Sequence, residues 1–209
     1  MFSKVFWAVD PKIQFKTYEV QFGEYPPNIN ECDAYLITGS KASSYDDVPW
    51  IYALKEFIKE LDQNKKKLIG VCFGHQIIAE ALGGSVRKSP MGWHAGVDSI
   101  LLNNYAIEYG DKDKKYNLVF SHQDEVDKLP RNATLIAESA SCPIGMFLIE
   151  NHIFCTQGHI ELDRKFARMI YDFRKDQIGN TKHKYACETL DMKTDELEVA
   201  NTLLNFLRK

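Results

Sequence analysis

The sequence predicts an α/β fold, and three observations lead to this class. Short apolar runs typical of strands alternate with longer amphipathic runs over residues 34–82. Hydrophobic residues make up 44% of the chain and charged residues 26%, which is an ordinary globular composition. The 209 residues are enough for one core to bury most of the apolar surface. We therefore expect a single domain over residues 1–209, with a parallel sheet built from right-handed βαβ units.

The first unit consists of two strands joined by a helix. "AYLIT" (residues 34–38) and "KLIGV" (67–71) are the predicted strands. Residues 48–64 are the predicted helix, because their apolar side chains recur at helical spacing on one face. These side chains are Trp50, Leu54, Phe57, Ile58 and Leu61. A second helix over residues 73–82 ends at Gly83-Gly84, where a left-handed cap favours glycine.

After Gly84 the sequence predicts short strands separated by turn residues. They cover residues 97–102, 116–121, 133–139, 145–150 and 152–157. Only a tight hairpin can join the last two, so we expect antiparallel pairs in this part. Two helices, at about 163–177 and 193–208, close the chain, and the polar segment "GNTKHKYACETLDMK" between them is predicted to be a surface loop. The lysine-rich run at 109–117 could mark a docking surface, but a solvated turn is the favoured interpretation of such a charge run.

Charge and cysteine content argue against several classes of partner. The net charge of -3 supplies no field that would attract nucleic acid or an anionic membrane. No apolar run approaches the ~20 residues of a membrane span, and no signal-peptide pattern opens the chain, so we expect a cytoplasmic protein. The five cysteines are odd in number and contain no C-x-x-C pair. This predicts reduced thiols, with neither a metal nor a cofactor.

Cys72 lies between Gly70 and Gly74 in "GVCFG", where a predicted strand runs directly into a helix. Glycines on both sides remove the clashes of a sharp strand-to-helix turn. A cysteine at such a turn would stand exposed at the carboxyl end of the strand and at a helix N-terminus, where the helix dipole favours the thiolate. The alternative is a packed core thiol, since cysteine is among the most buried residue types. The glycine setting favours the nucleophile.

A nucleophilic cysteine needs a base, and His159 is the strongest candidate. His159 and Glu161 follow a predicted strand and Gly158, so a local turn there could bring imidazole and carboxylate together. Such a pair would activate the thiol and fix the imidazole's tautomer. The alternative for both residues is a solvated loop. The other histidines are assigned elsewhere: His75 to support of the turn, His94 and His183 to surface loops, and His152 to a hairpin turn.

Four ordered motifs now give the sequence a resemblance to the class I (triad) glutamine amidotransferase-like family. "GVCFGHQ" (70–76) resembles its nucleophile elbow, and "QGHIE" (157–161) its His-x-Glu motif. "LITGSKASSYDDVPWI" (36–51) resembles its oxyanion loop, and "SHQDEVDKLPRNATLIAES" (121–139) a segment of its free-standing members. The resemblance implies a flavodoxin-like three-layer sandwich, with a mostly parallel central sheet and a small antiparallel subsheet.

The resemblance also implies roles for single residues. Cys72 resembles the nucleophile that attacks a glutamine side-chain amide to give a γ-glutamyl thioester and ammonia. His159 resembles the base that then protonates the leaving nitrogen, and Glu161 its orienter. The family's oxyanion donors are backbone NH groups, here those of Phe73 and of the Gly39-Ser40 turn.

Substrate contacts follow from the same motifs. Gln76 resembles a residue that contacts the γ-glutamyl group, although a helix residue facing the sheet edge is an equal alternative. The backbone around His122-Gln123 resembles the part that holds the substrate's α-amino and α-carboxyl groups. The Asp46-Asp47 pair could hold a substrate ammonium, or it could cap the helix entered at Pro49.

The chain departs from the family pattern at three places. Ile160 stands where proline is usual between the histidine and the glutamate. Ser40 follows Gly39 where the family often has a second glycine, and a positive φ there would be costly. Met1-Phe2-Ser3 stands where the first helix should already be under way, so we expect the family's first parallel strand to be absent and an edge of the sheet to be exposed.

These motifs favour a hydrolase. No ATP-binding glycine loop and no second core is visible, so no synthase domain is expected. Two segments resemble members related to γ-glutamyl peptidases, which makes a γ-glutamyl amide the first choice of small-molecule substrate. A glutaminase subunit that passes ammonia to a separate synthase is one alternative. A non-catalytic redox sensor, which would need only an oxidisable Cys72, is another. The oligomeric state stays open.

Overall fold

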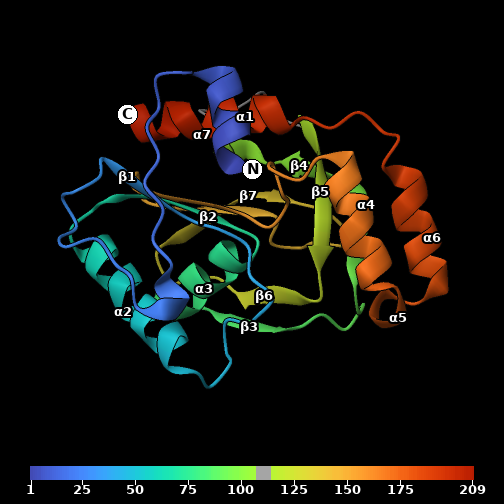
Figure 1. Ribbon diagram of the computed structural model, residues 1–209, viewed down its shortest axis with the longest axis horizontal. Helices are drawn as coiled ribbons and strands as arrows, with labels where there is room; N and C mark the ends of the chain where they lie inside the picture. The colour runs from blue at the N-terminus through green and yellow to red at the C-terminus, as the bar shows by residue number, and fades with distance from the viewer. Residues whose placement is uncertain (107–113) are drawn as a thin grey trace.

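The computed structural model describes residues 1–106 and 114–209, and it contains a seven-stranded sheet with helices on both faces (Figure 1). The strand order is β1-β2-β9-β8-β7-β4-β5, and β3 and β6 form a separate two-stranded sheet. The strands are β1 (Ala34–Ile37), β2 (Lys67–Val71), β3 (Ser85–Lys88), β4 (His94–Leu102), β5 (Lys115–His122), β6 (Asp124–Lys128), β7 (Ala133–Glu138), β8 (Met146–Ile149) and β9 (Ile153–Thr156). The helices are α1 (Phe2–Val9), α2 (Pro49–Gln63), α3 (Phe73–Ala81), α4 (Arg164–Phe173), α5 (Lys175–Ile178), α6 (Asn180–Thr189) and α7 (Glu196–Arg208), with short 3-10 turns at Val20–Phe22 and Asn104–Ala106.

Strand direction sets where a site can form. β1, β2 and β9 are parallel neighbours, whereas the remaining neighbours in the large sheet pair antiparallel. By these pairings β1, β2, β9, β7 and β5 point one way, and β8 and β4 point the other way. The carboxyl ends of β1, β2 and β9 therefore meet at one edge, where open α/β sheets present ligand-binding loops. The α/β class and the small antiparallel sheet are confirmed.

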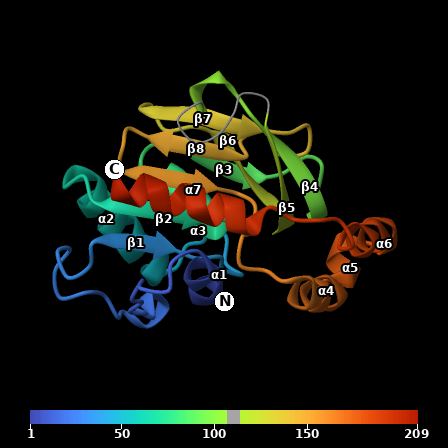
Figure 2. The same cartoon turned by 90° about the horizontal axis from the view of Figure 1, so that it is seen from above.

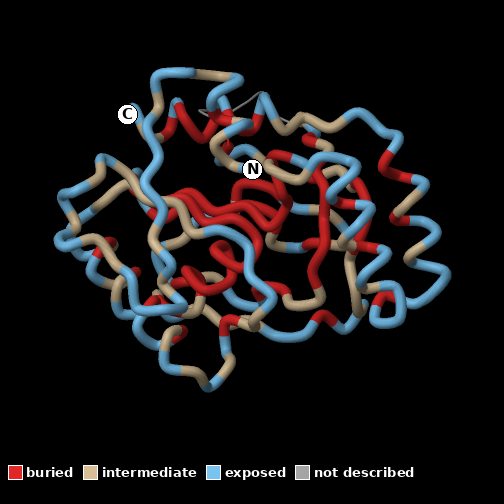
Figure 3. The backbone as a smooth tube through the Cα atoms, in the orientation of Figure 1, coloured by how far each residue is buried: buried red, intermediate tan, exposed pale blue. Residues whose placement is uncertain are grey.

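Three layers are visible around β1, β2 and β9 (Figures 1 and 2). One face is covered by α1 and α7, whose Phe6, Val199 and Leu203 are buried against it. The other face is covered by α2 and α3 through Ile58, Ile77 and neighbouring apolar residues. The buried parts of the backbone accordingly concentrate in the central strands and α3 (Figure 3). None of the described helices is long and apolar enough to cross a membrane.

The predicted strands and the first two predicted helices are confirmed, with small shifts at the ends. The strand over 67–71 has the predicted bounds, and the helix predicted over 73–82 ends at Ala81. Gly83 adopts a φ of 92°, the N–H of Gly84 donates to the Ala79 carbonyl at 2.8 Å, and that of Gly83 donates to Glu80 at 3.2 Å. This is the left-handed cap for which glycine was expected.

The structure differs from the expected local structure at three places. The segment "GNTKHKYACETLDMK" contains α6 rather than a surface loop, because Ala186 and Thr189 pack it against β4 although its other residues give little amphipathic signal. Strands β3 and β6 were not predicted, since their polar and charged side chains hide the alternation. Val48, not an aspartate, is the N-cap of α2. Residues 109–113 of the lysine-rich run lie outside the described residues.

Candidate active site

Cys72 stands at a sharp turn between β2 and α3. Its φ of 54° and ψ of -103° are unusual for a residue other than glycine, and it is the N-cap of α3. A Cβ on Gly74 would lie 2.1 Å from the Ile37 carbonyl oxygen, and one on Gly70 would lie 2.7 Å from the Gly74 oxygen. Both positions therefore need glycine so that β1, β2 and α3 can approach one another closely. The prediction that this thiol is exposed is wrong: Cys72 is only 7% exposed and belongs to the buried core, because the close packing of β1, β2 and α3 encloses the turn.

The segment after β9 brings His159 to the same edge of the sheet. The N–H of Cys72 donates to the Thr156 carbonyl at 2.9 Å, and that of His159 donates to the Val119 carbonyl at 2.8 Å. Between these two anchors the chain turns at Gly158, where a Cβ would lie 2.8 Å from Leu118. The turn lets His159 and Glu161 meet, with 2.8 Å between Nδ1 of His159 and Oε1 of Glu161.

The charges around His159 suit an imidazolium. His159 is 7% exposed, and burial by itself would lower its pKa. Electrostatic attraction to Cys72 and Glu161 outweighs burial, so the pKa of His159 lies well above its ordinary value. Among the described residues, Nε2 of His159 has no hydrogen-bond partner, and neither has Oε2 of Glu161. Such a group can accept a proton from a thiol and hold it as an ion pair.

The segment predicted as the oxyanion loop lies against Cys72 and His159. A Cβ on Gly39 would be 3.3 Å from Cε1 of His159 and 3.9 Å from Cβ of Cys72. Ser40 does not adopt a positive φ, so it carries no strain from replacing a glycine. Phe73 opens α3, where a backbone N–H has no partner within the helix. The backbone N–H groups of Phe73 and of the Gly39-Ser40 turn are therefore available to a negative charge that forms near the Cys72 sulfur.

The side-chain amide nitrogen of Gln76 donates hydrogen bonds to two other groups of the protein. Nε2 donates to the Asp124 carbonyl at 2.7 Å and to Oε1 of Gln157 at 3.0 Å, and Gln76 is 4% exposed. Of the two alternatives open for Gln76, these contacts favour the structural one. They tie α3 to β6 directly behind the elbow.

His122 is the last residue of β5, and its imidazole is buried and neutral. Nδ1 lies 2.8 Å from the Asp124 carbonyl, and Nε2 has no partner among the described residues. Burial, reinforced by the positive charge of His94, lowers the pKa of His122 to about 3. Gln123 is partly buried, and its carbonyl accepts from the N–H of Ser89 at 2.8 Å. His122 thus offers a ring nitrogen as acceptor.

Asp124 links these pieces, and sequence reasoning missed it. Its backbone carbonyl accepts from Gln76 and His122, as above. Its carboxylate accepts from the hydroxyl groups of Ser43 and Tyr45, with 2.9 Å to the latter. The loop after β1 is therefore fastened to the start of β6. Its place directly after "SHQ" was the only sequence signal.

Two of the other histidines lie where the sequence did not predict them. His94 begins β4, stacks on Phe120 at a centroid distance of 4.4 Å, and has Nε2 3.2 Å from Asp98. His183 lies on α6 rather than in a loop. His75 is buried on α3 beside the elbow, and His152 is in the hairpin turn as predicted.

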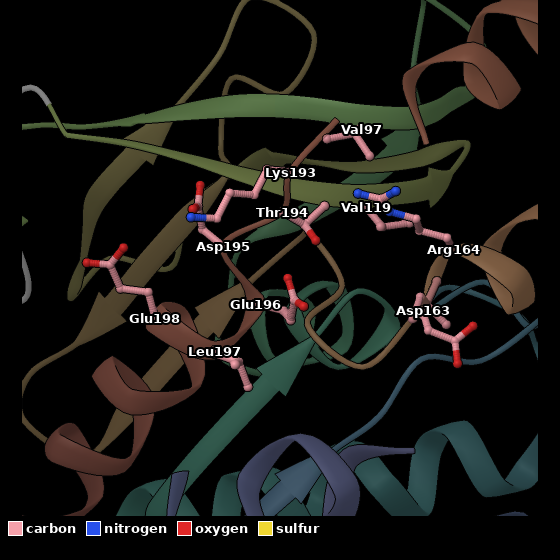
Figure 4. Close-up of a pocket in the computed structure, with 11 residues that line it drawn as sticks. Val97, Val119, Asp163, Arg164, Lys193, Thr194, Asp195, Glu196, Leu197 and Glu198 are labelled. Carbon is pink, nitrogen blue, oxygen red and sulfur yellow. The ribbon is translucent and has the colours of Figure 1, made fainter. Parts of the chain in front are cut away.

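Neither the pocket in Figure 4 nor a possible metal cluster involves the predicted site residues. The pocket lies between the start of α4, residues 193–198 and strands β4 and β5. Among the described residues, Asp172, His183 and Cys187 could hold a metal ion, with ligand atoms within 4.8 Å of one another. Nε2 of His183 is already 2.7 Å from Oδ1 of Asp172, a contact that ties α6 to α4 without an ion.

Comparisons with known proteins bear on this geometry. Residues 12–173 match the family model described as glutamine amidotransferase class-I. Gamma-glutamyl peptidase 3 of Arabidopsis thaliana is 36% identical over 167 residues, which cover 76% of this chain and 67% of that protein. GMP synthase (glutamine-hydrolyzing) of Aeropyrum pernix is 28% identical over 108 residues, 51% of this chain and 21% of that enzyme. The crystal structure of a glutamine amidotransferase from Methylobacillus flagellatus shares the fold, with a TM-score of 0.79 and 21% identity over 97% of this chain and 84% of that one.

Proposed function

The chain belongs to the glutamine amidotransferase class-I family, and we propose that it hydrolyses γ-glutamyl amide bonds with Cys72 as the nucleophile. One observation carries the proposal: a cysteine with positive φ at a strand-to-helix turn shares its surroundings with the His159–Glu161 pair. The likeness to a gamma-glutamyl peptidase supports the choice of substrate.

The first half of the proposed reaction forms a thioester. His159 takes the thiol proton, and the Cys72 sulfur attacks the γ-carbonyl carbon of the substrate. The negative oxygen that results faces the N–H groups of Phe73 and of the Gly39-Ser40 turn. When the carbon–nitrogen bond breaks, His159 gives the proton to the leaving nitrogen, and a γ-glutamyl thioester remains on Cys72.

The second half releases glutamate. His159 takes a proton from water, the hydroxide oxygen attacks the thioester carbon, and the proton returns to the sulfur as the carbon–sulfur bond breaks. Glu161 keeps Nδ1 of His159 protonated throughout, so that Nε2 is the nitrogen that exchanges protons. The neutral His122 can accept a hydrogen bond from the substrate's α-ammonium group, since its Nε2 has no partner among the described residues.

A second candidate function is a glutaminase subunit that delivers ammonia to a separate synthase. The likeness to a GMP synthase favours this candidate, because such an enzyme couples glutamine hydrolysis to synthesis in one chain. The site chemistry would be identical, and only the fate of ammonia would differ. All five cysteines are free, which supports a reducing compartment such as the cytoplasm for either function.

Glutamate release from glutamine and from γ-glutamyl peptides tests the proposal, with the wild type and Cys72→Ala compared. We expect the substitution to reduce kcat/KM by on the order of 10³-fold or more, because no other group can form the thioester. Cys155→Ala is the matched control, since that thiol is fully buried in β9. Equal rates in the wild type and Cys72→Ala would refute the mechanism. Glutamine hydrolysis that rises only when cell extract is added would favour the second candidate.

A further inference from the structure

We infer that Arg174 and Lys41 form a cationic rim beside Cys72 that binds a carboxylate on the leaving half of the substrate. The inference rests on the proposed function and narrows its substrate class. The preferred substrate is then a γ-glutamyl peptide whose leaving amino acid or peptide keeps its C-terminal carboxylate, rather than glutamine, which releases uncharged ammonia.

Arg174 is held rigidly where α4 ends. Nη1 donates to Oγ of Ser121 at 3.0 Å, and the guanidinium lies 5.0 Å from the centroid of the Trp93 ring. Stacking on an aromatic ring and a fixed hydrogen bond leave an arginine pre-organised for a bidentate partner. Ser121 directly precedes His122, so Arg174 is anchored to the strand end that also enters the proposed substrate site.

Arg174 is charged, and Cys72 is among the groups that act on its pKa. Burial lowers the pKa of Arg174, and the negative charge of Cys72 opposes that shift. Among the described residues, Arg174 forms no ion pair. The nearby carboxylate of Asp172 is bound instead to His183 and Arg168. A guanidinium has five N–H donors, so a ligand carboxylate can accept from those that Ser121 does not use.

Lys41 is the second cation of the rim. It follows the Gly39-Ser40 turn, which lies against Cys72 and His159. Its Nζ lies 5.4 Å from the ring centroid of Phe173, the residue before Arg174. Lys41 also has no ion pair among the described residues. The loop after β1 and the end of α4 therefore each bring one cation to the same side of the proposed site.

The exposed fractions of the residues around the proposed site place the rim next to the leaving half of the substrate. His122 is 5% exposed and its Nε2 has no partner among the described residues, so it suits the γ-glutamyl half. Phe173 is 77% exposed, and Lys41 is also exposed, which places the rim at the solvent side of the site. A leaving amino acid extends about 3.5 Å from the scissile nitrogen towards its carboxylate. A dipeptide substrate can thus reach cations that glutamine cannot.

Hydrolysis of γ-glutamylglycine and of γ-glutamylglycinamide tests this inference, because the two substrates differ only in the terminal carboxylate. We expect the wild type to prefer the carboxylate by about tenfold or more in kcat/KM, the scale of a charge-assisted pair. Arg174→Gln should remove most of this preference, Arg174→Lys should keep part of it, and Lys41→Gln should have a smaller effect. Arg168→Gln, which removes an arginine from the outer face of the same helix, should keep the full preference.

Calorimetric binding of both compounds to Cys72→Ala separates this inference from the proposed hydrolysis. The ratio of the two dissociation constants should follow the same order when Arg174→Gln, Lys41→Gln or Arg168→Gln is added. No preference in the wild type or in Cys72→Ala overturns the inference. Equal losses for both compounds in Arg174→Gln also overturn it, because they assign Arg174 to the glutamyl half or to structural support. A wild type that binds with the expected ratio but hydrolyses neither compound refutes the hydrolase alone.

Discussion

The parallel strands β2 and β9 have a histidine paired with a carboxylate at each end. At the carboxyl ends, Nδ1 of His159 lies 2.8 Å from Glu161. At the amino ends, Nε2 of His152 lies 2.7 Å from Asp62 of α2. Both imidazoles are buried, at 7% and 1% exposure. The pair alone therefore does not distinguish a candidate active site from a structural tie.

The backbone around each pair makes the difference. His152 belongs to the hairpin between β8 and β9, and its carbonyl accepts from the N–H of Leu68, so the pair closes the amino ends of two strands. His159 instead lies beside a chain that turns through Cys72 at positive φ. Cys72 is itself only 7% exposed, and the strained turn sets its side chain at the carboxyl end of β2, on the same side as His159. The comparison predicts that replacing the carboxylate by an amide lowers activity at the carboxyl ends and lowers stability at the amino ends.

The largest expected contrast is between Glu161→Gln and Asp62→Asn. Glu161→Gln should lower kcat by on the order of 100-fold or more, because an amide neither fixes the tautomer nor stabilises the imidazolium. Asp62→Asn should leave kcat within about twofold and lower the free energy of unfolding by about 1 kcal/mol, since it weakens one partly exposed hydrogen bond to a histidine. Activity assays and urea unfolding of both variants measure the contrast. Similar losses of activity in both would show that the two ends are not functionally distinct.

A smaller contrast concerns the pH dependence of Cys72 alkylation. Burial opposes protonation of His159, but the charges of Cys72 and Glu161 raise its pKa above the ordinary value. The imidazolium is then present at neutral pH, favours the thiolate, and is lost only as the pH rises through the raised pKa. We expect His159→Ala to slow alkylation by about tenfold or more at pH 6–7 and much less at high pH.

His152→Ala is the control for this measurement, and it should keep the wild-type alkylation profile because its imidazole lies at the other end of the strands. Alkylation is followed by mass spectrometry of the peptide that contains Cys72. If His159→Ala gave the wild-type profile, Cys72 would be an oxidisable thiol independent of the base, as the redox-sensor alternative requires.

Most of the predicted site depended on local sequence signals. Gly70 and Gly74 flank Cys72 at a spacing that only a tight turn explains, and the structure shows the close contacts that require them. His159 and Glu161 were recognisable because Gly158 breaks the strand before them. The alternation of apolar and polar segments was enough for the α/β class and for every strand of the large sheet.

What the sequence could not predict depends on distant partners. Arg174 ends a helix about a hundred residues after Cys72 in the chain, and only the fold brings Trp93, Ser121 and Lys41 around it. Helix α6 has little amphipathic pattern because it is fixed through few buried residues and one hydroxyl group. In the sequence, Asp124 is one charge in a polar run. Only the fold brings Ser43 and Tyr45 of the loop after β1 to its carboxylate.

Asp124 gives the smallest expected effect and the finest test of the comparison. The Ser43 and Tyr45 hydroxyl groups anchor the loop after β1, which we propose to be the oxyanion loop, to its carboxylate, so we expect Asp124→Ala to lower kcat by about tenfold with little change in KM. Asp124→Asn keeps an acceptor oxygen and should recover part of that loss, which general destabilisation would not allow. Glu150→Gln breaks the ion pair with Lys65 that anchors the hairpin at the other end, and it should leave kcat unchanged. Steady-state kinetics of the three variants would contradict this role for Asp124 if KM rose while kcat stayed constant, because the carboxylate would then contribute to binding rather than position the loop.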